Sequence, residues 1–285
     1  MTDATEVRSP VGARRTRRGA GADRPPWPVL VLAGVATLFF ALPFLGLLWR
    51  VPWGDAWRLL TEESSLQALR LSLVCSLSAT VLSVVFGVPL AWVLARAGFP
   101  GRRLVRALCV LSMVLPPVVG GVALFAAFGR RGVVGGPLYD WFGVRITFTT
   151  VAVILAETFV AMPFLVLSVE AGLRGLDRRP EEAARTLGAS RWYTFRRVTL
   201  PAVRPALVAG AVLAWARALG EFGATITFAG NLPGKTQTMP LAVYLALESD
   251  TGQALVLSLV LVAISFGVLV GLRDRWLGGG PPEVR

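Results

Sequence analysis

The sequence predicts an all-α integral membrane protein with six transmembrane helices, and three observations support this. The 285 residues are 54% hydrophobic and only 16% charged, whereas an average soluble domain has about 25% charged residues. The apolar residues gather in long runs, and a helix needs about 20 such residues to cross a bilayer. The basic residues bracket these runs instead of forming one polar face, which argues against nucleic-acid binding despite a formal net charge of +12.

Six apolar runs are long enough to be spans. They cover residues 28–49, 69–94, 104–128, 147–169, 202–219 and 254–272. Prolines interrupt several runs, which membrane helices tolerate because neighbouring helices satisfy the freed carbonyls. In the third run Pro116 and Pro117 stand side by side, so we expect a kink there. Such a kink suits a pore wall and ordinary helix packing about equally well.

The basic residues of the loops predict the orientation. Roughly 20 Lys and Arg lie in or beside the two tails and segments 95–103 and 171–200, and roughly 6 lie in the opposite loops. The positive-inside rule therefore puts both termini and segment 171–200 in the cytoplasm. The expected division is a disordered Arg-rich cytoplasmic tail at 1–27, a first span and external loop at 28–64, the main transmembrane domain at 65–272 and a cytoplasmic tail at 273–285.

A polar segment, RRPEEAARTLGASRWYTFRRVTLP at residues 178–201, separates the fourth and fifth runs. Asp177 is placed to cap a helix that begins directly after it, and Gly188 to end that helix in the left-handed conformation. Ser190 is placed to cap a second short helix before Pro201 opens the fifth span. On the residues alone, the segment is either an interfacial helix held at the lipid headgroups by its arginines or a docking helix for another protein.

The spacing within this segment resembles the signature of permease subunits of ABC importers, with valine in place of the usual isoleucine. The matching residues are Glu182, Ala183, Ala184, Gly188, Val198, Leu200 and Pro201. The resemblance implies the type I ABC importer permease fold with a cytoplasmic coupling helix, which docks on an ATP-hydrolysing subunit. It assigns docking to the first four residues, and to Leu200 and Pro201 the return of the chain into the membrane.

Other stretches are similar to the molybdate branch of this family. They are VLPPVVGG, ITFTTVAVILAETFVAMPFLV and WARALGEFGATITFAGNLPGKTQTMPLAVY. The likeness covers residues 65–272 and implies the membrane-spanning permease subunit of an ATP-driven importer for molybdate, and perhaps tungstate, working by alternating access. The chain has no Gly-x4-Gly-Lys-Ser/Thr phosphate loop, so we expect no catalytic residue and no bound cofactor, ATP and Mg²⁺ being used by a partner.

The resemblance also implies the partners. One chain carries one coupling helix and two ATPase subunits need two, so we expect a homodimer with two ATP-binding cassette subunits. An extracytoplasmic molybdate-binding protein delivers the anion, and the lipid of a bacterial plasma membrane surrounds the spans. No nucleic acid is expected.

Polar residues rich in hydrogen-bond donors follow the fifth run. They are Glu221, Thr225, Thr227, Asn231, Lys235, Thr236, Gln237 and Thr238. Oriented N–H and hydroxyl groups can hold a tetrahedral dianion without full countercharges. These residues therefore predict either the anion path or a contact with the binding protein, and an ordinary polar external loop is the alternative.

Charged residues within the spans are costly and often functional. Glu157 lies in the fourth run and Arg217 in the fifth, so they either pair across the bundle or face a cavity separately. The main alternative function is a sulfate or thiosulfate ABC importer. A remote alternative is a proton-coupled secondary transporter, in which Glu157 or Glu221 would carry the proton. The absence of histidine and of a CxxC motif argues against an intramembrane enzyme and a metal site.

Overall fold

The computed structural model describes residues 26–277, and within them every regular element is a helix. The chain forms two compact units, Met1–Gly46 and Leu47–Arg285. Residues 1–25 of the predicted Arg-rich tail and residues 278–285 of the predicted carboxy-terminal tail lie outside the described residues. The expected disorder of the first tail therefore stays a prediction.

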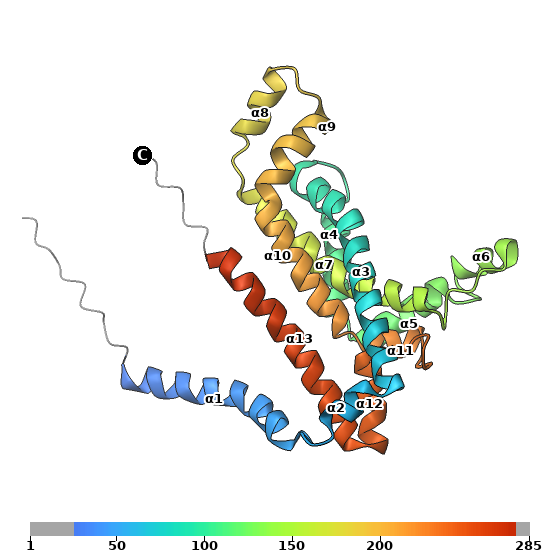
Figure 1. Ribbon diagram of the computed structural model, residues 1–285. Helices are drawn as coiled ribbons and strands as arrows, with labels where there is room; N and C mark the ends of the chain where they lie inside the picture. The colour runs from blue at the N-terminus through green and yellow to red at the C-terminus, as the bar shows by residue number, and fades with distance from the viewer. Residues whose placement is uncertain (1–25, 278–285) are drawn as a thin grey trace, which may run out of the picture. The chain divides into compact units, whose positions relative to one another are not determined.

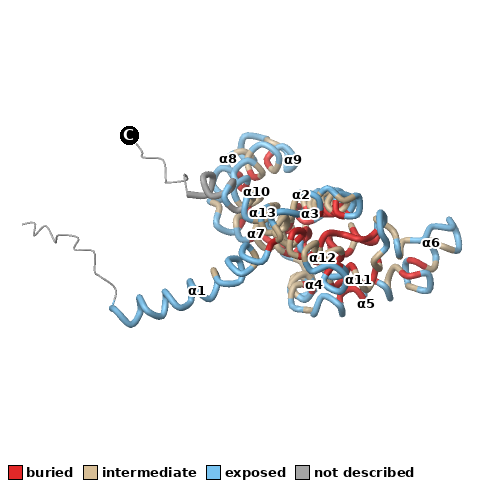
Figure 2. The backbone as a smooth tube through the Cα atoms, turned by 60° about the horizontal axis from the view of Figure 1, so that its bottom comes forward, coloured by how far each residue is buried: buried red, intermediate tan, exposed pale blue. Residues whose placement is uncertain are grey.

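Helix α1, Trp27–Arg50, contains the first predicted span and accounts for the described part of the first unit. It is apolar on every side and none of its residues is buried, as its pale blue colour in Figure 2 shows. A helix that is hydrophobic all round needs lipid or another chain around it. This exposure is therefore the expected property of a membrane span.

Three long helices form the centre of the second unit. They are α3 (Glu63–Arg96), α7 (Thr150–Gly175) and α10 (Leu200–Leu219), which run alongside one another in Figure 1. Their contact surface is rich in small residues, with Ala79, Ala161 and Ala214 fully buried. Small side chains let helix backbones approach closely, which is how helices associate within a membrane.

The third predicted span is broken into two helices, α4 (Arg102–Val114) and α5 (Pro117–Phe128). Leu115 and Pro116 between them are extended, with ψ angles of 136° and 132°. Two consecutive prolines cannot donate to the carbonyls four residues before them, so the helix ends here. Within residues 26–277, five helices are long and apolar enough to cross a membrane. They correspond to the other five predicted spans, and the third is the one divided here.

The remaining elements are mostly short. They are α2 (Ala56–Thr61), α6 (Gly135–Phe142), α11 (Gly223–Phe228), α12 (Met239–Ser249) and the long last helix α13 (Thr251–Leu277), with the segment between α7 and α10 described below. Helix α13 contains the last predicted span. Helices α2 and α12 lie at the end of the bundle opposite α8 (Figure 1).

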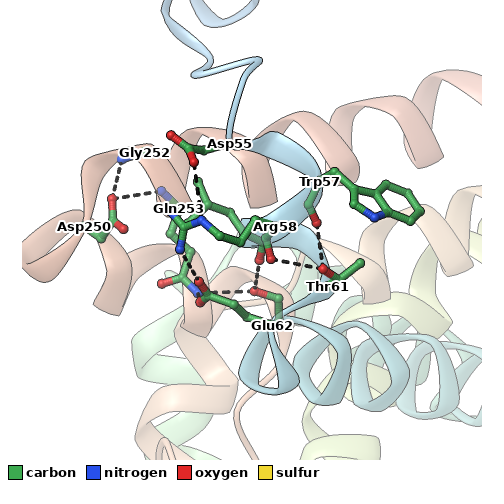
Figure 3. Close-up of polar contacts among 10 residues, drawn as sticks. Asp55, Trp57, Arg58, Thr61, Glu62, Asp250, Gly252 and Gln253 are labelled. Carbon is green, nitrogen blue, oxygen red and sulfur yellow. Dashed lines mark hydrogen bonds and ion pairs between the residues drawn. The ribbon is translucent and has the colours of Figure 1, made fainter.

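Polar contacts fix the start of α13 to the start of α3 (Figure 3). The Asp250 carboxylate accepts hydrogen bonds from the N–H groups of Gly252 and Gln253 at 2.8 and 3.2 Å. The Gln253 amide donates to Glu62 at 3.1 Å and to Ser65 at 3.2 Å. These bonds tie together two membrane-length helices that are far apart in the sequence.

Helices α5 and α11 cross at very short range. A Cβ on Gly121 would overlap the Thr227 hydroxyl and come within 2.8 Å of the Ala224 carbonyl oxygen. A Cβ on Gly223 would lie 2.6 Å from the Pro117 side chain. Each helix thus contributes one glycine to the crossing, because any side chain there would push the other helix away.

Candidate functional site

The polar segment after α7 begins as its local chemistry predicts. Helix α8 runs Arg179–Thr186, one residue later than expected, and the Asp177 carboxylate accepts a hydrogen bond from the Arg179 N–H at 3.0 Å. Gly188 follows with a φ of +84°, in the left-handed region that favours glycine. The predicted helix and its glycine stop are therefore confirmed.

The helix after this turn is longer than predicted. The Ser190 hydroxyl caps α9 (Arg191–Thr194), which continues through a π-helical turn, η1 (Phe195–Thr199), into α10 without a break. The prediction of a separate short helix and a new start at Pro201 is wrong. A π turn reaches five residues back and accommodates the missing N–H of the proline. Leu200 and Pro201 thus lie inside one continuous helix. Their role in the return of the chain into the membrane stays a prediction.

Helix α8 exposes the residues that the family resemblance assigned to docking. Glu182, Ala183 and Gly188 are exposed and Ala184 is half-buried. Leu187, which the sequence analysis did not single out, is 88% exposed. The signal available for it was a lone leucine between a polar helix and the glycine stop. An exposed apolar side chain among small residues offers another protein a close contact.

Arg217 forms an ion pair with Glu221 and none with Glu157, so of the two placements left open for these charges the pair across the bundle is wrong. The Arg217 Nη1 and Glu221 Oε2 atoms are 2.6 Å apart, and the two residues are four apart in sequence. The Glu221 Oε1 atom also accepts a hydrogen bond from the Ala224 N–H at 2.8 Å, at the start of α11. Glu157 is 1% exposed in α7, and its Oε2 has no hydrogen-bond partner among residues 26–277.

A cavity of about 250 Å³ lies where α4 ends and α5 begins. The break from Ser112 to Pro117 forms one wall, and Phe159 of α7 and Arg217 of α10 contribute to the others. The Arg217 side chain is 29% exposed. The cavity therefore brings a cationic group to a hollow between apolar helices, a costly placement that is often functional.

The donor-rich residues after α10 mostly point into the protein. The buried residues are Glu221, Thr225, Thr236, Gln237 and Thr238. Thr227 and Asn231 are half-buried, and Lys235 is exposed. The Thr236 hydroxyl accepts from the Leu232 N–H at 2.8 Å, and Thr150 donates to the Lys235 carbonyl at 2.9 Å. These groups brace the loop and do not form one open array of donors. Their contact with an anion stays a prediction.

The chain belongs to the family of binding-protein-dependent transport system inner membrane components, whose model matches residues 87–278. It is therefore a multi-pass membrane protein and a translocation subunit of an ABC importer, not an enzyme. ATP hydrolysis in such a system belongs to a separate subunit. This finding agrees with the exposed α8 and with the helices of membrane length.

Within this family, the chain is similar to molybdenum transport system permeases. It is 46% identical to the ModB protein of Mycobacterium bovis over 89% of this chain and 95% of that one. It is 43% identical to the ModB protein of Escherichia coli over 74% of this chain and 92% of that one. The sulfate transport system permease CysT of Escherichia coli is 37% identical over 78% of this chain and 80% of that one.

The fold has a close counterpart among solved structures. A chain of a bacterial ABC transporter involved in the import of the acidic polysaccharide alginate matches with a TM-score of 0.64 at 19% identity. The match covers 86% of this chain and 91% of that chain. The predicted fold class, an all-α ABC importer permease, is therefore confirmed.

Proposed function

We propose that the chain is the membrane-spanning permease subunit of an ATP-driven molybdate importer that also takes tungstate. The observation that supports this best is the identity of 46% and 43% to molybdenum permeases over most of the chain, against 37% to a sulfate permease. Molybdate and sulfate are both tetrahedral dianions, so the same architecture serves either. Sulfate or thiosulfate is the alternative cargo.

The ATPase subunit acts on this chain through α8. The exposed Glu182, Ala183, Leu187 and Gly188, with the half-buried Ala184, form the docking surface for an ATP-binding cassette subunit. The alanines and the glycine allow the partner backbone to come close, and the leucine fills an apolar depression in it. ATP and Mg²⁺ act in that partner, and this chain binds no cofactor.

The assembly contains two copies of this chain. Each copy supplies one α8 to one of two ATPase subunits. The charge of the loops supports a cytoplasmic location for α8 and both termini. The end of the bundle with α12 then faces the extracytoplasmic molybdate-binding protein, with Lys235 exposed toward it. ATP binding draws the two α8 helices together and opens the pore outward, and hydrolysis resets it.

The anion path passes the cavity at the break between α4 and α5. Arg217 supports this because its guanidinium lines the cavity while its Nη1 atom is 2.6 Å from the Glu221 carboxylate. The planar fork of the guanidinium is well suited to bind an oxyanion. The low dielectric between the helices strengthens that attraction.

Replacing Arg217 with glutamine is expected to lower molybdate uptake by at least about tenfold, the effect of losing ~1.4 kcal/mol of electrostatic stabilisation. Uptake of labelled molybdate by cells measures this. The single change also leaves Glu221 buried without its partner, so the control is the double variant Arg217→Gln/Glu221→Gln. If the double variant recovers full uptake, Arg217 only neutralises the carboxylate and the proposed anion path is wrong.

Competition for uptake tests the cargo. In proteoliposomes with the permease, the ATPase subunits and the binding protein, a tenfold to hundredfold excess of unlabelled tungstate is expected to block ATP-driven uptake of labelled molybdate (about 90% inhibition or more by simple competition). The same excess of sulfate is expected to leave uptake nearly unchanged. Equal inhibition by sulfate would favour the alternative cargo, and uptake that follows a proton gradient without ATP would exclude the ABC mechanism.

A further inference from the structure

Two adjacent glutamates on α8 face different sides of the helix. Glu182 is exposed, whereas Glu181 is 8% exposed. Neighbouring residues on a helix point about 100° apart, so a helix that presents one side to a partner turns the other toward its own protein.

The Glu181 carboxylate joins three elements. Its Oε1 atom accepts hydrogen bonds from Arg96 Nη2 at 3.2 Å and from Thr199 Oγ1 at 3.0 Å. Arg96 is the last residue of α3, and Thr199 is the last residue of the π turn that leads into α10. Glu181, Arg96 and Thr199 together form what we call the α8 clasp.

The α8 clasp is shielded from water. The Arg96 and Glu181 side chains are 8% and 10% exposed, and Thr199 is 2% exposed. A buried ion pair adds little net stability, because the loss of hydration offsets the attraction between the charges. Its geometry is nevertheless well defined, since both charges must stay paired. The clasp is therefore better suited to holding α8 in a fixed position than to stabilising the fold.

The helices that meet at the clasp extend to the other end of the bundle. Helix α3 has 34 residues and is about 50 Å long at 1.5 Å per residue. Toward its other end, the Ser72 hydroxyl accepts a hydrogen bond from the Met239 N–H at 2.7 Å, at the start of α12. A displacement of α8 thus has a continuous, packed route to the opposite side of the membrane domain.

Apart from the clasp, α8 is held by its two chain connections. The helix is joined to α7 through the turn at Asp177 and to α9 through the turn at Gly188. Turns of this kind allow a short helix to rotate. Without the clasp, a push on α8 would be taken up by rotation about these two turns.

We propose that Glu181, Arg96 and Thr199 are positioning residues that transmit the movement of α8 to α3 and α10. This inference rests on the proposed docking of an ATPase subunit on α8. The docking surface binds the ATPase subunit. The clasp transmits the movement of that subunit to the membrane-spanning helices. Loss of the clasp therefore separates ATP hydrolysis from transport without separating the subunits.

The test uses the full transporter, with both ATPase subunits and the binding protein, in proteoliposomes. Glu181→Gln is expected to keep the ATPase subunits bound and hydrolysing ATP, while molybdate uptake per ATP hydrolysed falls at least about tenfold, the result of losing a charge-assisted bond pair. The matched control is Glu182→Gln, the same change on the exposed side. It is expected to weaken co-purification of the ATPase subunits, which Glu181→Gln leaves bound.

A second variant covers the case in which Glu181→Gln fails to fold. Thr199→Val removes one hydrogen bond to the carboxylate and keeps the shape of the side chain, so uptake per ATP is expected to fall roughly threefold. A purely structural role would reduce folded protein and ATPase binding together and leave the ratio unchanged, which overturns the inference. Failure of the unaltered chain to bind any ATPase subunit would instead contradict the proposed function.

Discussion

An aspartate in place of Leu187 is expected to leave the permease folded and to abolish its association with the ATPase subunits. The leucine is 88% exposed, so its removal costs the isolated chain nothing in packing. Its burial in a partner is worth about 1.5–3 kcal/mol, and a carboxylate in the same apolar depression adds a desolvation cost. Together these lower the affinity on the order of 100-fold or more. Co-purification and ATP-driven uptake measure the effect.

The matched control for this change is Leu187→Met, which keeps the volume and the apolar character of the side chain. It is expected to retain ATPase binding. An unchanged thermal unfolding midpoint of Leu187→Asp would show that the loss is one of docking and not of folding. If this variant binds the ATPase as the unaltered chain does, the exposed side of α8 is not the docking surface.

Alanine in place of Gly121 is expected to destabilise the membrane domain by about 1–3 kcal/mol or more. The added Cβ would overlap the Thr227 hydroxyl and lie 2.8 Å from the Ala224 carbonyl oxygen and 3.0 Å from its Cα. The threonine side chain can rotate away, but the backbone of α11 cannot move without shifting Glu221 and the ion pair it makes. The unfolding midpoint of the purified protein in detergent should fall by several degrees.

The control for this prediction is Gly267→Ala on α13, where no heavy atom lies within 4 Å of an added Cβ. That change is expected to be neutral or slightly stabilising, because alanine favours helix more than glycine does. The double variant Gly121→Ala/Thr227→Ala should recover only part of the loss. Full recovery would mean that the close approach of the two backbones is not what requires the glycine.

Features set by local chemistry could be predicted from the sequence. Asp177, Gly188 and Ser190 act at their own positions in the chain, so their roles in starting and ending helices followed from residue type. The break at Pro116 followed from the missing N–H groups of two prolines. The membrane helices followed from the length of the apolar runs.

Features that depend on distant residues could not be predicted in this way. Arg96 and Glu181 are 85 positions apart, and no periodicity within either helix indicates their contact. Arg217 and Glu221 are different, because a spacing of four was readable in the sequence. The sequence analysis considered only Glu157 as a partner for Arg217, as one of two open placements, and did not consider Glu221. The burial of the threonine-rich loop could not be predicted either. Hydroxyl groups form hydrogen bonds within a loop as readily as they form them with a ligand.

The break between α4 and α5 has a consequence for the tightness of the membrane barrier. The carbonyls of Ser112 and Met113 have no N–H to pair with four residues later, and both residues line the 250 Å³ cavity. Carbonyls freed in this way pair with neighbouring helices or with water, and the cavity volume is large enough for several water molecules. A hydrated pocket in the middle of a span cannot act as a seal, so protection against ion leakage must come from the dry, tightly packed layers on either side of it.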